Sequence, residues 1–173
     1  MIARVLTLLL LLAGQSAHAA TKGSAAAELS HGYFCALETV ATEAAKGTVS
    51  GTINLVERSP DFIGPGPEVP ARLGIGFGVK VRMAPGLTGR ATVRVQHPPM
   101  GPQAVTRQHW QTTLTDERAQ YLGYTFEQSY ELLPGPWSLS ASANGRPIYS
   151  VSFTVVDPRQ MPWVNCGAQI PLS

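Results

Sequence analysis

Apolar and polar residues alternate with a period of two along much of this chain. The clearest run is Gly74 to Met83, whose apolar members are Ile75, Phe77, Val79, Val81 and Met83. Successive side chains of an extended strand point to opposite faces, so this run predicts a strand with one buried face. The runs 91–96 and 150–155 alternate in the same way. The chain is therefore constrained to an architecture built from half-buried strands.

Weaker alternation predicts further strands at 33–38, 52–57, 110–114, 121–126 and 137–142. Asn144-Gly145 readily adopts the positive φ angles of a type I′ turn, which predicts a hairpin between Trp137–Ser142 and Arg146–Val156. The segments between strands are too short for crossover helices. We therefore expect an all-β fold, an antiparallel β-sandwich of about seven or eight strands, as a single domain over residues 20–156.

Two proline-rich segments interrupt the alternation. Ser59 to Pro70 contains four prolines and His97 to Gln108 contains three. Proline has no amide hydrogen to donate to a strand ladder, so neither segment is expected to form a central strand. We expect both to be surface loops, and loops on a rigid scaffold commonly carry recognition. They are the favoured contact surfaces for an unidentified protein or surface ligand.

Residues 1–19 have the three parts of a secretory signal peptide. Arg4 precedes an apolar run at 5–13, and Ala17-His18-Ala19 is a small-residue cleavage site. The run is about half the ~20 residues that a membrane-spanning helix needs, and no later segment is apolar enough to cross a bilayer. We expect a secreted or periplasmic protein that begins near Ala20 and is not inserted in a membrane.

The chain has two cysteines, Cys35 and Cys166. Export to an oxidising compartment favours one disulfide between them, which would fasten the irregular C-terminal tail, residues 157–173, across an early strand. Two unpaired thiols are the alternative. A redox-catalytic pair is disfavoured because such pairs usually have the spacing C-x-x-C.

Charge and motifs exclude several functions. The chain carries 13 basic and 11 acidic residues, and removal of Arg4 leaves 12 basic ones, a balance without the electrostatic signature of a nucleic-acid-binding protein. No G-x-S-x-G, H-E-x-x-H or phosphate-binding glycine loop is present. Glu127 and Glu131 would lie about 13 Å apart in extended chain, too far for a glycosidase pair, and are interpreted as solvated charges. A hydrolase with an unrecognised site remains one alternative.

His97, Met100 and His109 form the one group with ligand chemistry. Two imidazoles and a thioether are suitable donors for copper, so a small copper- or other metal-handling protein is a further alternative. The spacing matches no established metal motif, and we favour no metal and no cofactor.

A glycine strip, Gly74, Gly76 and Gly78, lies opposite the apolar face of the first strand described above. We expect an aromatic side chain from a neighbouring strand to cover it, with a docking strip for a partner as the alternative.

Several fragments resemble a known bacterial family. They are Pro70-Ala71-Arg72-Leu73-Gly74, Phe77-Gly78, His97-Pro98-Pro99-Met100, 121–126 (YLGYTF), Glu131-Leu132, Pro134-Gly135 and Trp137. In order and spacing, over about residues 30–156, the chain resembles the domain-of-unknown-function 3859 family. The resemblance implies a compact immunoglobulin-like β domain with no assigned activity. We therefore expect an exported, non-enzymatic binding or accessory module.

Overall fold

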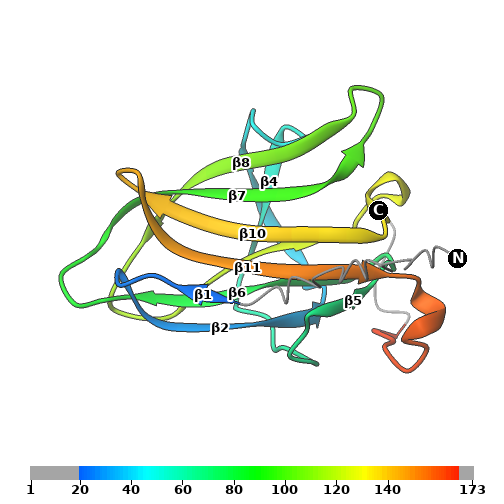
Figure 1. Cartoon of the computed structure of the whole chain (residues 1–173), viewed down its shortest axis with the longest axis horizontal. Helices are drawn as coiled ribbons and strands as arrows, with labels where there is room; N and C mark the ends of the chain where they lie inside the picture. The colour runs from blue at the N-terminus through cyan, green and yellow to red at the C-terminus, as the bar shows by residue number, and fades with distance from the viewer. Residues whose placement is uncertain (1–19, 168–173) are drawn as a thin grey trace, which may run out of the picture.

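The computed structural model describes residues 20–167, which fold into strands and two short 3-10 helices (Figure 1). In chain order the elements are β1 (Thr21–Lys22), β2 (Ala26–Cys35), β3 (Thr39–Ala44), β4 (Thr52–Val56), β5 (Glu68–Pro70), β6 (Ile75–Met83), β7 (Gly89–Met100), β8 (Val105–Leu114), β9 (Gln120–Thr125), η1 (Ser129–Glu131), β10 (Gly135–Ala143), β11 (Arg146–Val156) and η2 (Pro158–Gln160). The predicted signal peptide, residues 1–19, lies outside the described residues.

The larger sheet has the strand order β1-β11-β10-β7-β8, with β5 also pairing with β11. Strands β10 and β11 form the predicted hairpin, and Asn144 and Gly145 have φ angles of 49° and 75°, as a type I′ turn requires. The smaller sheet has the order β2-β6-β9 and is antiparallel throughout. The prediction of a β-sandwich is confirmed, although β5 pairs with β11 in parallel, which the alternation did not indicate.

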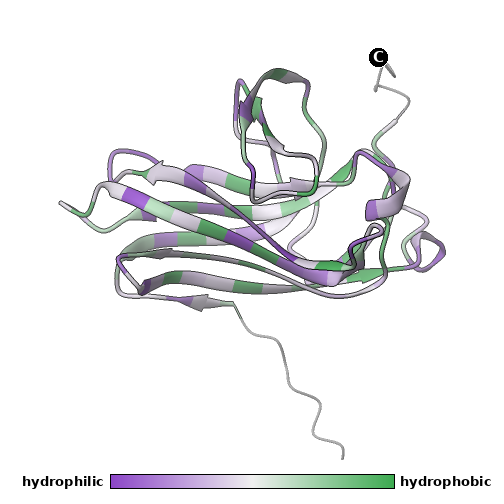
Figure 2. Cartoon of the chain, turned by 90° about the horizontal axis from the view of Figure 1, so that it is seen from above, coloured by the Kyte–Doolittle hydropathy of each residue, from purple (hydrophilic) through white to green (hydrophobic). Residues whose placement is uncertain are grey.

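The core lies between the inner faces of these two sheets, whose alternating apolar bands Figure 2 shows. Val79 and Val93 are fully buried, from the smaller and the larger sheet respectively. Phe77 occupies the centre, with its ring centroid 4.6 Å from that of Phe153 and 5.6 Å from that of Trp137. The Trp137 indole N–H donates to the Leu133 carbonyl at 2.9 Å, so this buried ring has its polar group satisfied.

The segment Ser59–Pro70 is part of the sandwich, which corrects the expectation of a surface loop. Tyr33 at the edge of β2 donates its amide to the Gly64 carbonyl at 3.0 Å and accepts from the Ile63 amide at 2.9 Å. Glu68–Pro70 forms β5, whose Val69 is fully buried. Prolines are compatible with this arrangement because β5 lies at an edge of its sheet, where one side of the strand needs no donor.

The segment His97–Gln108 also differs from the predicted loop. Strand β7 continues to Met100 and β8 begins at Val105, which leaves a connection of four residues, 101–104. The pairing of the two strands jumps from Gln96↔Arg107 to Met100↔Val105. Pro98 and Pro99 therefore lie in an irregularity of β7, where a missing amide donor interrupts no ladder bond.

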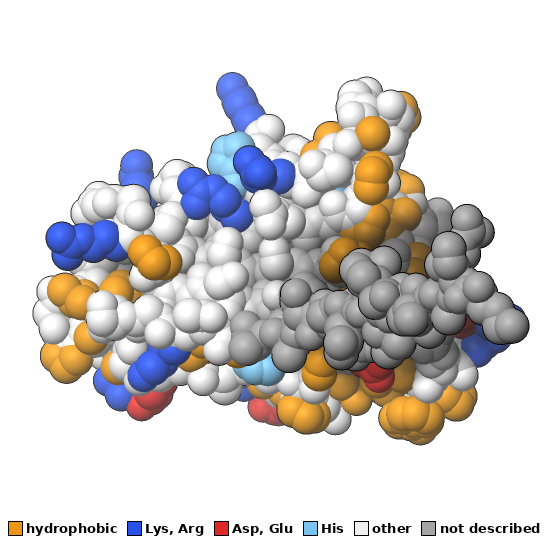
Figure 3. Space-filling view, viewed as in Figure 1, with side chains coloured by type: hydrophobic (Ala, Val, Ile, Leu, Met, Phe, Trp, Pro, Cys, Tyr) orange, Lys and Arg blue, Asp and Glu red, His pale blue; other side chains and the backbone are white. Residues whose placement is uncertain are grey.

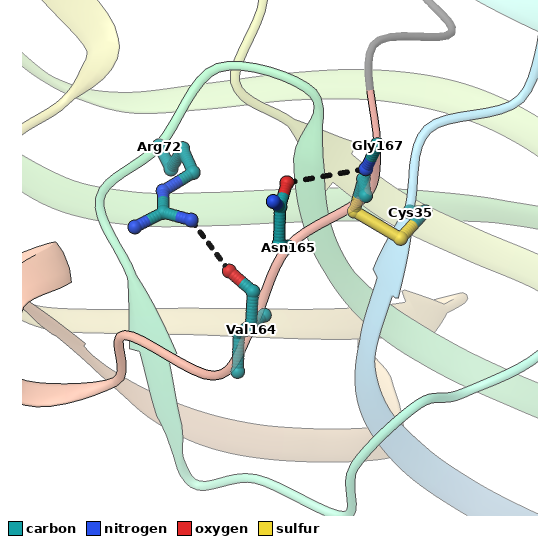
Figure 4. The surroundings of a disulfide bond; sticks show 6 residues. Cys35, Arg72, Val164, Asn165 and Gly167 are labelled. Atoms are coloured by element: carbon teal, nitrogen blue, oxygen red, sulfur yellow. Dashed lines mark hydrogen bonds between the residues drawn. A yellow bond between two sulfur atoms is a disulfide. The ribbon is translucent and has the colours of Figure 1, made fainter.

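A disulfide joins Cys35, the last residue of β2, to Cys166 in the C-terminal segment (Figure 4). The Arg72 guanidinium donates to the Val164 carbonyl at 2.7 Å, and the Gly167 amide donates to the Asn165 side chain at 3.1 Å. Val164 is buried in the core. The tail after β11 is therefore held by one covalent bond, one charged hydrogen bond and an apolar anchor as far as Gly167.

Candidate binding cleft beneath the β3–β4 hairpin

Strands β3 and β4 form a two-stranded hairpin outside both sheets, and Figure 2 shows it standing off the rest of the sandwich. Beneath it lies a cleft of about 690 Å³, within the usual range of ligand sites. One wall is β4 and the segment after it, up to Pro60. The opposite wall is β9, and inward-facing residues of β8 line the cleft as well. The lining residues used below are Thr52–Val56, Gln108, Trp110, Gln120–Thr125, Glu127 and Glu131.

The hairpin tip is fixed to the edge of β8. The Gly47 carbonyl accepts from the His109 amide at 2.9 Å, and the Val49 amide donates to the Gln108 side-chain oxygen at 2.8 Å. A Cβ atom on Gly47 would lie 2.5 Å from the His109 carbonyl oxygen. Only glycine permits this approach without a shift of backbone. The tip thereby covers part of the exposed edge of β8.

The free edge of β9 runs along the cleft. The Phe126 amide donates to the Ile75 carbonyl of β6. In an antiparallel strand, the backbone hydrogen-bonding groups of successive residues point alternately toward and away from the partner strand. Leu122 and Tyr124 therefore bond to β6, whereas the backbone groups of Tyr121, Gly123 and Thr125 point away from it. Those three residues make no backbone hydrogen bond on that side within residues 20–167. All six residues of β9 line the cleft, as an exposed strand edge would.

The opposite wall is β4, all five of whose residues also line the cleft. Backbone groups of an antiparallel strand point alternately toward and away from the partner strand. The Ala45 amide donates to the Gly51 carbonyl, and counting from this bond along β4 places the Asn54 backbone groups away from β3. The Asn54 side chain donates to the Glu127 carboxylate, which ties this wall to the segment after β9. Partial burial, and secondarily the negative charge of Glu131, raise the pKa of Glu127, while the Asn54 bond opposes the rise.

Glu131 supports the cleft from within. Its carboxylate accepts from the Tyr124 hydroxyl at 2.8 Å and from the amides of Glu127 and Gln128 at 2.6 and 2.8 Å. The side chain is buried. The interpretation of Glu131 as a solvated charge is therefore wrong, because the chain turns into η1 after β9 instead of staying extended. With three donors bound, this carboxylate positions Tyr124 and the turn.

Gln108 connects the hairpin tip to the interior. Its side-chain oxygen accepts from Val49, so its amide nitrogen is the donor toward the His97 Nε2 atom, 3.0 Å away. His97 Nδ1 lies 2.8 Å from the Pro98 carbonyl, which only accepts, so the ring is neutral with its hydrogen on Nδ1. Burial lowers the pKa of His97, with the Pro98 bond and the Glu131 charge opposing it.

The residues of the alternative metal site, His97, Met100 and His109, are only partly brought together. The Gln108 amide nitrogen lies 3.9 Å from the Met100 sulfur and 3.0 Å from His97 Nε2, so His97 and Met100 share this neighbour. His109 is exposed and points to the other face of β8. No group of three or more His, Cys, Asp and Glu side chains able to hold a metal occurs in the part of the chain that the structure describes.

Aromatic side chains cover two of the three glycines of the strip, Gly76 and Gly78, as predicted. The Phe34 ring lies where a Cβ on Gly76 would be, and Tyr121 lies over Gly78 and Gly123. These two rings meet edge to face with centroids 5.2 Å apart. Both residues line the cleft, so the strip is an internal packing surface beside the site.

None of the helices between residues 20 and 167 has the length and hydropathy needed to cross a bilayer.

No motif in the sequence marks β4, Asn54 or the edge of β9 as functional. Period-two alternation identifies both strands but does not indicate which strand ends a sheet, because sheet order depends on long-range pairing. Gln108 was included only as the last residue of a predicted loop. Gln108 is buried because it lies on the inward face of β8, between two outward-facing neighbours. The alternation of residues 108–114 is the sequence signal that could have indicated this.

Comparison with solved structures finds an immunoglobulin-like protein from Pseudomonas aeruginosa, 17% identical in sequence, with a TM-score of 0.51. The match covers 82% of this chain and 100% of that chain. This likeness shows the fold, an immunoglobulin-like β-sandwich. No curated protein matches the sequence. The family model described as a domain of unknown function, DUF3859, matches residues 24–155, and the chain therefore belongs to that family.

Proposed function

We propose that this protein is an exported, non-enzymatic binding module that holds an extended polypeptide segment in the cleft beneath the β3–β4 hairpin. The segment adds to the free edge of β9 as an extra strand. Strand addition to an exposed sheet edge is a common mode of peptide recognition, in which main-chain hydrogen bonds provide affinity.

The observation that carries the proposal is the unpaired backbone of Tyr121, Gly123 and Thr125 along a cleft of about 690 Å³. An exposed edge favours aggregation, and proteins usually protect it. Here the edges of β2 and β8 are partly covered by Gly64 and Gly47, whereas the edge of β9 faces a hollow. Six strand residues extend about 20 Å, enough for a ligand strand of similar length.

The chemistry of the walls suits a peptide. Trp110 and Leu55 offer apolar contact to alternate side chains of a strand, and Asn54 and Gln120 supply polar groups. Three acids line the cleft, Glu57, Glu127 and Glu131, but Glu131 already accepts three hydrogen bonds and Glu127 accepts one from Asn54, which disfavours a catalytic carboxylate pair. This arrangement supports binding without turnover.

A peptide selection tests the proposal. Random ten-residue peptides displayed on phage are selected on the protein, and the affinities of the selected peptides are measured by calorimetry. Thr125→Pro removes an amide that points away from β6 and places a ring at the edge, so we expect affinity to fall at least tenfold. Gln111→Pro is the matched control. Because the His109 amide points away from β7, the Gln111 amide two residues later does so too, and its removal from the outer edge of β8 should change affinity less than twofold.

Far-UV circular dichroism establishes that both proline variants are folded. Equal binding by folded Thr125→Pro would contradict strand addition at β9. Selected peptides whose binding is lost in Gln111→Pro but kept in Thr125→Pro would place the ligand on β8 instead.

A further inference from the structure

The outer face of the larger sheet carries a cluster of basic side chains, on the opposite face of β8 from the residues that line the cleft. Arg90 and Arg94 point outward from β7, and Arg107 and His109 point outward from β8. Arg94 lies directly opposite His109, and Gln96 lies opposite Arg107, so the two arginines Arg94 and Arg107 are diagonal neighbours. Strand pairing brings together these cations, which are distant in the sequence, so the near balance of total charge is compatible with a locally basic face.

No acidic side chain neutralises the cluster. The ion pairs formed within residues 20–167 involve Arg58, Lys80, Arg82 and Arg159. Figure 3 shows the blue groups and a pale-blue histidine gathered on the upper part of this face, where β7 and β8 run, with no red among them. Adjacent like charges on a sheet are unfavourable unless an anion is shared between them.

The positions between the arginines are neutral hydrogen-bonding side chains. On the outward face of β7, β8 and β10 these are Thr92, Gln96, Gln111, Thr113, Ser138, Ser140 and Ser142. Arg94 donates to the Ser142 hydroxyl at 2.9 Å, and Gln111 donates to the Thr92 hydroxyl at 2.9 Å. One bond fixes the Arg94 guanidinium and leaves further donors for a ligand, since arginine has five.

We propose that this face, defined by Arg90, Arg94, Arg107 and His109, binds an acidic polysaccharide. Guanidinium groups bind carboxylates through paired hydrogen bonds, and the hydroxyl and amide groups between them match sugar hydroxyls. A single-stranded nucleic acid would need aromatic rings for base stacking, and the outward positions named above contain no Phe, Tyr or Trp. A membrane surface would need apolar side chains to insert, and these positions contain none. The site is independent of the cleft beneath the hairpin.

The test uses polygalacturonate, a polymer of carboxylated sugars, with the mature protein at low ionic strength. We expect saturable binding by calorimetry that weakens as salt is added, and no binding to neutral dextran. The double variant Arg94→Gln/Arg107→Gln should lower affinity at least tenfold. A control of equal charge, Lys22→Gln/Arg159→Gln, removes two cations outside this face and outside the cleft, and should change affinity less than twofold.

Amide chemical-shift mapping on the unmodified protein gives a second measurement that does not depend on variants. Shifts confined to β7, β8 and β10 are expected on addition of polygalacturonate. Equal loss of affinity in the two double variants, or shifts spread over other faces, would overturn the proposal. Tighter binding to single-stranded DNA or to phosphatidylglycerol vesicles, lost in Arg94→Gln/Arg107→Gln, would assign the face to nucleic acid or membrane and would also overturn it.

Discussion

Glu131 is a charged residue that the fold uses as a structural support. Its carboxylate receives one hydroxyl and two backbone amides, while the side chain is buried beside the cleft. Bonds to a charged acceptor stabilise a protein by about 1.5–3 kcal/mol, roughly twice the value for neutral pairs. Glu131→Gln keeps the shape and removes the charge.

We expect Glu131→Gln to lower the free energy of unfolding by about 1–2 kcal/mol, because the three donors then face a neutral amide. Urea denaturation measures the change. Glu127→Gln is the control, since the Glu127 carboxylate accepts one side-chain bond, from Asn54, and, among the described residues, no backbone amide. Equal stability of Glu131→Gln and the unmodified protein would contradict the supporting role.

His97 makes stability depend on pH. Because burial lowers its pKa in the folded state, the unfolded chain takes up a proton first as pH falls. The contribution of neutral His97 is therefore fully present above the unfolded value near 6.5 and is lost as pH decreases below it. Thermal unfolding between pH 7.5 and 5 should show a steeper loss of Tm in the unmodified protein than in His97→Gln. Parallel curves for the two proteins would contradict this account.

At the scale of elements, the strands with strong alternation were predictable and their surroundings were not. The runs around β6 and the β10–β11 hairpin match the structure closely, because local pattern and turn chemistry agree there. The segment Ser59–Pro70 was misplaced because its bonds to Tyr33 and β11 depend on residues far away in the chain. Shortening that segment is now expected to destabilise the sandwich.

The hairpin tip gives a prediction at this scale. In Gly47→Ala the new methyl group meets the His109 carbonyl, so the tip must move away from β8. We expect faster amide hydrogen exchange at Val49, whose bond to Gln108 weakens, with little change in the exchange of β6. Gly89→Ala is the control, because Gly89 has open space around it and no positive φ angle, and it should leave exchange at Val49 unchanged. Unaltered exchange at Val49 in Gly47→Ala would contradict the anchoring role.

At the scale of the whole molecule, the disulfide closes a loop with a sequence separation of 131. A closed loop of that length is worth about 5 kcal/mol in a chain-entropy treatment. We expect Cys35→Ser and Cys166→Ser to lower Tm by several degrees each, with the double variant no less stable than either. Differential scanning calorimetry under oxidising conditions measures this, and additive losses would contradict a shared bond.

The sequence indicated the sandwich and the cysteine pair, but not the cleft. Period-two patterns report which face of each strand is buried, and they reported it correctly for β6, β7 and β11. The cleft arises where a two-stranded hairpin lies against the edge strands of the two sheets, β8 and β9, and no local pattern encodes that arrangement. The basic face was not predictable for the same reason, because its arginines come from two strands that only long-range pairing brings together.

Amide hydrogen exchange in β9 is the most direct test of the proposed function. In the unliganded protein, Leu122 and Tyr124 should exchange slowly because they bond to β6, whereas Tyr121, Gly123 and Thr125 should exchange fast. Saturation with a selected peptide should slow exchange at Tyr121, Gly123 and Thr125 at least tenfold and leave the other two nearly unchanged. Tight peptide binding that leaves those three amides fast would contradict strand addition at the edge of β9.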